Sequence, residues 1–187
     1  MATLAPSLHR IRNDEPRFFI ERAHIFLQLQ YRIDDDGEYE FGYRKVAQTA
    51  AANDGFVARG IEQLRRSLQE QERFGSSLDI RIKDRDTVVQ VDTFGPHLSW
   101  SLIRDAVTTL DDHSDLYGEL RYFDGSNWVR REDFGGRVCT RIRFKAKFND
   151  GASDYERHKF SYNVRLRDPD GNFVEHEIDP DIKNPSV

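Results

Sequence analysis

The sequence is poor in cysteine, methionine and long apolar runs. Its 187 residues include one cysteine, Cys139, and one methionine, which excludes an intramolecular disulfide and a zinc site built from several cysteines. No apolar stretch approaches the roughly 20 residues of a membrane-spanning helix, and charged residues interrupt the N-terminal segment where a secretory signal needs an apolar core. We therefore expect a soluble, cytoplasmic protein that side-chain packing stabilises.

Common catalytic and cofactor signatures are also missing. The sequence has no P-loop, no GxGxxG fingerprint and no GxSxG elbow. Two acidic turns, at Asp34 and Asp168, space their carboxylates as calcium loops do, but Tyr39 and Phe173 stand where such a loop requires glycine. We expect no metal and no cofactor, assign no catalytic residue, and lean against an enzyme, although a site can be assembled from scattered residues.

The chain is rich in charged and aromatic residues. Charged residues make up 33% of the sequence, and 13 Phe, 7 Tyr and 2 Trp supply the large apolar surfaces of a folded core. The net charge of −5 disfavours a dedicated nucleic-acid binder, whose affinity depends on neutralising phosphates. Residues 116–167 carry 12 Lys and Arg against 7 Asp and Glu, whereas residues 168–187 carry 1 against 6. These charges of +5 and −5 can neutralise each other.

Alternating apolar and polar residues predict four β-hairpins. The expected strand pairs are residues 25–33 with 39–43, 78–82 with 87–94, 120–122 with 128–129, and 160–166 with 174–178. A five-residue loop in the last hairpin places Leu166 opposite Val174 and Arg165 opposite Glu175, so that both faces of the pair match chemically.

Alanine-rich composition predicts a helix over residues 44–52. Helical spacing predicts two more, over residues 57–73 and 100–110, the last with Ser99 as its N-cap. We therefore expect an α+β fold with two to three amphipathic helices on one face of antiparallel sheets, and an all-β, sandwich-like C-terminal third.

The expected domain organisation is a flexible arm over residues 1–16 followed by a single domain over residues 17–182. A subdivision of that domain into residues 17–113 and 117–182 is the alternative.

The most distinctive pattern covers residues 138–148, where apolar residues alternate with a row of cations. A strand with this pattern has one apolar face and one basic face. The candidate binding residues are this row and two aromatic residues that could stack on a ligand: Arg137, Arg141, Arg143, Lys145, Lys147, Trp128 and Tyr122. The alternative interpretation is a solvated face whose charges pair with neighbouring carboxylates.

Cys139 is a candidate reactive thiol. It lies between Arg137 and Arg141, and nearby cations lower a thiol pKa and favour the nucleophilic thiolate. The alternative is a small buried residue, which is the commoner role of a free cysteine.

Three functional hypotheses follow. The first is a non-catalytic protein that recognises a protein partner, or itself, through a sheet face or edge. The second is an enzyme or small-molecule binder with a pocket between helices and sheet. The third is a single-stranded nucleic-acid binder that uses the basic strand over residues 137–147. We expect no membrane partner.

Overall fold

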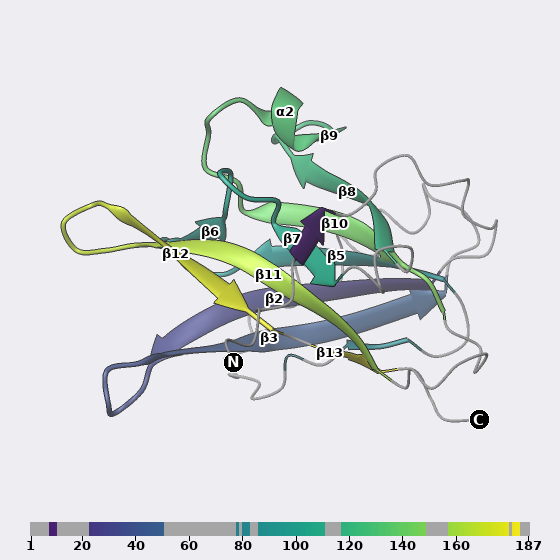
Figure 1. Ribbon diagram of the computed structural model, residues 1–187, viewed down its shortest axis with the longest axis horizontal. Coiled ribbons are helices and arrows are strands. Elements are labelled where there is room, and N and C mark those ends of the chain that lie inside the picture. Colours follow the sequence, from purple (N-terminus) through teal and green to yellow (C-terminus); the bar gives the residue numbers. More distant parts are fainter. Residues whose placement is uncertain are drawn as a thin grey trace, which may run out of the picture.

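The protein is built from two β-sheets, as the computed structural model shows (Figure 1). The structure describes residues 8–10, 23–50, 78, 80–82, 86–110, 117–148, 157–179 and 181–183. Within these ranges the only helix is α2, a single turn over Arg131–Phe134, which Gly135 ends with a φ of 64°. The expected α+β class is therefore wrong, because the described part of the chain is nearly all β.

The first sheet has six strands in the order β3-β2-β5-β10-β8-β9. Its strands are β2 (Ala23–Ile33), β3 (Tyr39–Ala50), β5 (Thr87–Thr93), β8 (Tyr117–Phe123), β9 (Trp128–Val129) and β10 (Arg141–Ala146). The pair β2–β5 is parallel, and the other pairs are antiparallel.

The second sheet is organised around the long strand β11 (Arg157–Arg167). Its other strands are β1 (Leu8–Arg10), β4 (Ile80–Arg81), β6 (Leu98–Trp100), β7 (Val107–Leu110), β12 (Phe173–Ile178) and β13 (Asp181–Lys183). The segment expected to be a flexible arm thus contains one strand, β1, which pairs with β7. Because β13 and β4 are parallel, both sheets depart from the expected antiparallel pattern.

A core rich in aromatic residues lies between the two sheets. The rings of Phe144 on β10 and Phe160 on β11 have centroids 5.8 Å apart, and the hydroxyl of Tyr43 on β3 donates a 3.0 Å hydrogen bond to that of Tyr162 on β11. Trp100 is fully buried against Tyr162. Burial of such large apolar surfaces is the dominant contribution to folding.

Three of the four expected hairpins are confirmed. They are β2–β3, β8–β9 and β11–β12. In the last, Leu166 lies opposite Val174 and Arg165 opposite Glu175, as the loop length predicts. The fourth pairing is wrong: β4 pairs with β13, whereas β5 lies between β2 and β10 in the other sheet.

Two expected helices are strands instead. Residues 44–50 continue β3, because their backbone pairs with β2 as far as Ala50, and sheet pairing overrides the helical preference of alanine. Residues 98–110 form β6, a loop and β7, so Ser99 pairs with Arg165 on β11 and caps no helix. Ile103, which lies within the expected helix over residues 100–110, is 75% exposed in that loop. The expected helix over residues 57–73 lies outside the described residues.

No helix in the part of the chain that the structure describes has the length and apolar character needed to cross a membrane.

Candidate functional site

The six-stranded sheet carries polar side chains on the face opposite the core. On β10, Ile142, Phe144 and Ala146 point into the core, and the alternate residues point to the other face. Strand register extends this second face across β2, β5 and β10. We call it the polar face, and its polar residues are His24, Gln28, Gln90, Asp92, Arg141, Arg143 and Lys145.

Asp92 on β5 is a buried carboxylate with an ion-pair partner. It lies opposite Arg141, whose Nε is 3.1 Å from Oδ1 and donates a 3.2 Å hydrogen bond to Oδ2. Gln90 Nε2 donates to Oδ1 at 3.3 Å. A buried charge is tolerated when it is paired and hydrogen-bonded in this way. Asp92 therefore fixes the orientation of the Arg141 guanidinium.

Two arginines of β10 lie over two aromatic rings of the β8–β9 hairpin. The guanidinium carbon of Arg141 is 4.7 Å from the ring centroid of Phe123, and that of Arg143 is 4.6 Å from the ring of Trp128. The two rings have centroids 5.2 Å apart. Both distances suit cation–π attraction. We call these four residues the arginine–aromatic stack.

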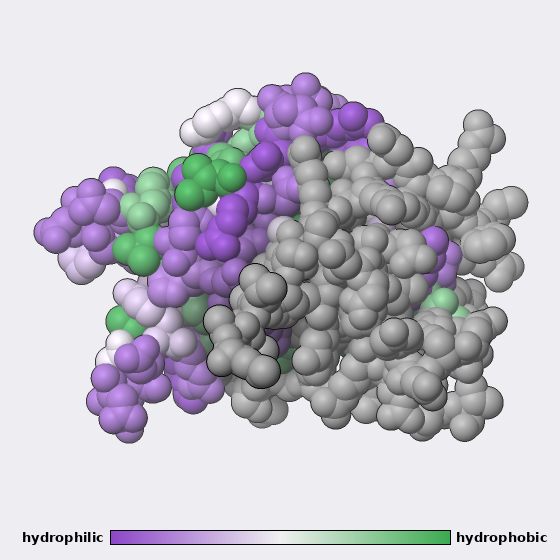
Figure 2. Space-filling view, in the orientation of Figure 1, coloured by the Kyte–Doolittle hydropathy of each residue, from purple (hydrophilic) through white to green (hydrophobic). Residues whose placement is uncertain are grey.

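A pocket of about 290 Å³ lies at the end of this stack. It is lined by Phe123, Asp124, Gly125, Phe134, Arg137, Val138, Thr140 and Arg141. These residues come from the β8–β9 turn, from the end of α2 and from the segment that enters β10. The guanidinium of Arg137 is 5.6 Å from the ring centroid of Phe134. We call this the β8–α2 pocket. Figure 2 shows, at its top, that the surface over the neighbouring elements α2 and β9 is hydrophilic.

Asp124 supplies the carboxylate of the pocket. Its Oδ1 accepts hydrogen bonds from the backbone N–H groups of Asn127 (2.7 Å) and Ser126 (2.8 Å). These two bonds hold the pKa of Asp124 below its usual value, and the positive charge of Arg137 acts in the same direction. Asp124 is therefore ionised at neutral pH.

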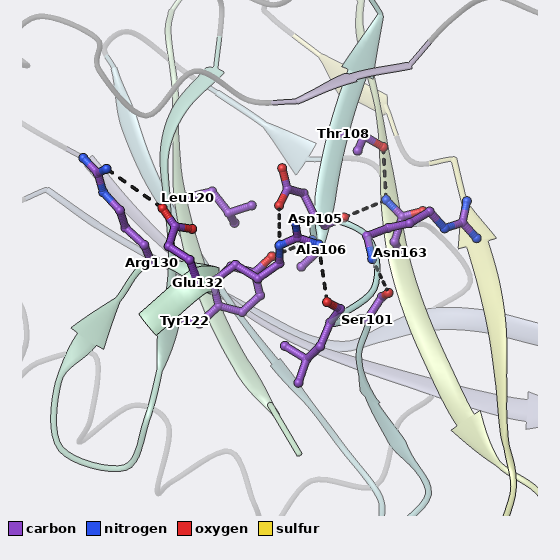
Figure 3. A network of polar contacts seen from close by, with 12 residues as sticks. Ser101, Asp105, Ala106, Thr108, Leu120, Tyr122, Arg130, Glu132 and Asn163 are labelled. Carbon is purple, nitrogen blue, oxygen red and sulfur yellow. Dashed lines mark hydrogen bonds and ion pairs between the residues drawn. The ribbon is translucent and has the colours of Figure 1, made fainter. Parts of the chain in front are cut away.

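A network of polar contacts holds α2 beside the pocket (Figure 3). Arg131 Nε is 3.1 Å from Oδ1 of the buried Asp105, and the backbone N–H of Ala106 donates a 2.8 Å hydrogen bond to the hydroxyl of Tyr122. Asn163 on β11 donates to the carbonyl of Asp105 at 2.8 Å. The loop between β6 and β7 is thus tied to both sheets and to α2. This arrangement places Phe134 at the pocket wall.

The structure brings together four of the seven residues that the sequence nominated for binding. Arg141, Arg143 and Trp128 belong to the arginine–aromatic stack, and Arg137 lines the pocket. Tyr122 instead points into the core, where it is 1% exposed and its ring offers no face to a ligand.

The two lysines lie apart from the pocket. Lys145 lies on the polar face but is 5% exposed and forms an ion pair with Glu119. Lys147 follows the end of β10 and is half-buried. The register between β10 and β8 shifts between Arg143 and Lys145, and Glu119 has a φ of 51° there.

Cys139 is fully buried rather than exposed beside cations. It forms an isolated bridge with Trp100, and its thiol donates to the carbonyl of Arg141 at 3.3 Å. Burial raises the pKa of Cys139 to about 11, so the expectation of a lowered pKa is wrong. The predicted alternation of apolar and basic residues over 138–148 does not hold before β10. Val138, which was expected on the apolar face, is 56% exposed.

Sequence reasoning missed Asp92, Phe123, Asp124 and Phe134. The alternation of residues 87–94 already places Asp92 on a polar face, but its pairing with Arg141 depends on the register between strands about 50 residues apart in the chain. Phe123 follows Tyr122, so period 2 assigns it to the face opposite the core. No three potential metal-ligating side chains gather within the described ranges.

One comparison with known proteins gives a match. A family model described as "Predicted novel nucleotide synthetase" matches residues 21–187. No curated protein and no solved structure matches the chain. The family match overturns the first hypothesis, a non-catalytic interaction protein, and the leaning against an enzyme. It favours the second hypothesis, an enzyme with a small-molecule substrate.

Proposed function

Because the chain belongs to the family of predicted novel nucleotide synthetases, we propose that it is an enzyme that acts on nucleotides and binds them in the β8–α2 pocket. The family match supports the class of substrate. One structural observation supports the location: two arginines and two phenylalanines surround a single pocket that continues into the arginine–aromatic stack.

The residues of the pocket suit both halves of a nucleotide. The planar guanidinium groups of Arg137 and Arg141 present forked N–H donors, which match phosphate oxygens. Phe123 is partly exposed at the pocket, where its ring can contact a base, whereas Phe134 is 3% exposed and forms the pocket wall from the core side. The volume of about 290 Å³ lies just below the range of small-molecule pockets, roughly 300–1,000 Å³, so the pocket has room for one nucleotide unit at most.

Phosphate chemistry explains why an enzyme of this class needs such cations. Forming or breaking a bond at a phosphorus atom spreads negative charge over the phosphate oxygens, and fixed positive groups stabilise that charge. Asp92 holds the Arg141 guanidinium before a ligand arrives. The arginine therefore does not have to be reoriented when the phosphate binds.

The test compares Arg137→Ala with Arg130→Ala. Arg130 is a matched control because it is exposed and pairs with Glu132 at 4.0 Å outside the pocket lining. Loss of hydrogen bonds to a charged phosphate costs about 1.5–3 kcal/mol, so Arg137→Ala should weaken ATP or GTP binding by tenfold or more in calorimetry.

Mass spectrometry should detect less product from the same nucleotides with the Arg137 variant than with the wild type. The Arg130 variant should form as much product as the wild type. Equal binding and turnover in both variants would contradict the proposed location. Absence of any nucleotide binding or turnover in the wild type would contradict the function itself.

A further inference from the structure

We propose that Asp124 is the specificity-determining residue of the β8–α2 pocket and selects nucleotides that present paired O–H or N–H donors. The ribose 2′,3′-diol and the N1–H and N2–H₂ edge of guanine both have this chemistry. The inference rests on the proposed function, because it names the part of the nucleotide that the pocket recognises.

The turn around Asp124 fixes its carboxylate. Oδ1 accepts the N–H groups of Ser126 and Asn127, and the backbone N–H of Asp124 donates to the Asn127 carbonyl at 3.0 Å. Gly125 has a φ of 105°, a conformation that L side chains rarely adopt. Among the residues that the structure describes, none donates a hydrogen bond to Oδ2. That oxygen is therefore available to a ligand in the pocket.

The charges of the pocket orient a nucleotide in one direction. The Asp124 carboxylate repels a phosphate, whereas Arg137 and Arg141 attract it. The phosphate end then faces the arginines, and the remaining part of the nucleotide faces Asp124.

An ionised carboxylate can only accept hydrogen bonds, so it favours a group that presents donors. The adenine edge places the acceptor N1 beside its amino donor and matches a carboxylate less well than guanine does. The ribose diol presents two O–H donors whichever base is attached.

The variant Asp124→Asn tests the contribution of Oδ2 of Asp124 as a hydrogen-bond acceptor for the nucleotide. Asparagine retains an Oδ1 that accepts the two turn N–H groups, so the turn is kept, but a donor Nδ2 replaces the acceptor Oδ2. Asp34→Asn is the matched control. Asp34 Oδ1 accepts the N–H groups of Asp36 (3.0 Å) and Glu38 (2.9 Å) in the β2–β3 turn, outside the pocket lining.

Affinities for a set of nucleotides separate the two sources of donors. The probes are GTP, ATP, 2′,3′-dideoxy-GTP, which lacks the diol, and ITP, which lacks the 2-amino group. The wild type and Asp34→Asn should bind GTP at least tenfold more tightly than one of these analogues. Weak binding of dideoxy-GTP assigns the ribose, and weak binding of ITP assigns the guanine edge. Asp124→Asn should bind GTP at least tenfold more weakly and lose that preference.

Two results would overturn the inference while leaving the proposed function intact. In the first, the wild type binds all four nucleotides equally; in the second, Asp124→Asn keeps the preference of Asp34→Asn. In both cases, Arg137→Ala still lowers the affinity for every nucleotide. If the wild type binds none of the four, the proposed function and this inference fail together.

Discussion

At the scale of single residues, the strand face decides what each side chain can do. Tyr122 and Phe123 are neighbours on β8, yet the first is buried in the core and the second lines the pocket. The sequence alone predicts that Arg141 and Arg143 lie on the same face of a strand, because they alternate with apolar residues. The sequence does not predict the ion pair of Asp92 with Arg141, because that pair depends on which strand lies beside β10.

Cys139 gives a prediction at this scale. Its pKa of about 11 lies above the ordinary value of 9.0 for a cysteine, so at pH 8 its thiolate fraction is roughly 100-fold lower than in the unfolded chain. Labelling with a thiol reagent should therefore be slowed at least that much in the native protein and become rapid in urea. Equal labelling rates in the two states would contradict the buried thiol.

The same shift predicts the sign of a pH effect on stability. The folded chain holds the Cys139 proton more tightly than the unfolded chain. The contribution of this group is therefore fully present below about pH 9 and is lost as the pH rises toward 11. Urea unfolding at a series of pH values should show this loss in the wild type and a smaller loss in Cys139→Ala.

At the scale of elements, an ion pair between Lys145 and Glu119 lies at the irregular pairing of β10 with β8. Lys145 is 5% exposed, and Glu119, its partner, sits at the register shift with a positive φ. Removing one member of a buried pair typically costs roughly 3–5 kcal/mol, because the other charge stays buried. The Glu119 side chain is 32% exposed, so a smaller cost is expected here.

Glu119→Gln should lower the free energy of unfolding by about 1–3 kcal/mol. The double variant Glu119→Gln/Lys145→Met should recover part of that loss, because it leaves no buried charge. The exposed pair Arg32–Glu40 provides the control, since Glu40→Gln should change stability by about 0.5 kcal/mol or less. A cost for Glu119→Gln no larger than that of Glu40→Gln in urea unfolding would contradict this interpretation.

At the scale of the whole molecule, three of the four local hairpins were predictable from the sequence, and the assembly of the sheets was not. The β11–β12 register follows from its turn length and its alternating residues. The parallel pairing of β2 with β5 joins segments far apart in the chain, and no local pattern encodes it. Residues 100–110 misled the prediction because apolar residues in two short strands and a loop coincide with helical spacing.

The sheets share one core, and the pocket lies where the polar face of one of them meets α2 and the β8–β9 turn. The ion pair of Arg131 with Asp105 ties α2 to the loop between β6 and β7. Asn163 on β11 donates to the carbonyl of Asp105 and ties the same loop to the second sheet (Figure 3).

Photo-affinity labelling with an azido-purine nucleotide, followed by peptide mapping, shows directly where a nucleotide binds. If nucleotides bind in the β8–α2 pocket, the label will be found within residues 122–141, with the tryptic peptide 122–130 as the main product, and excess GTP or ATP will prevent labelling. A label confined to β11, β12 or the β2–β3 hairpin, or one that excess nucleotide does not reduce, would contradict binding in this pocket.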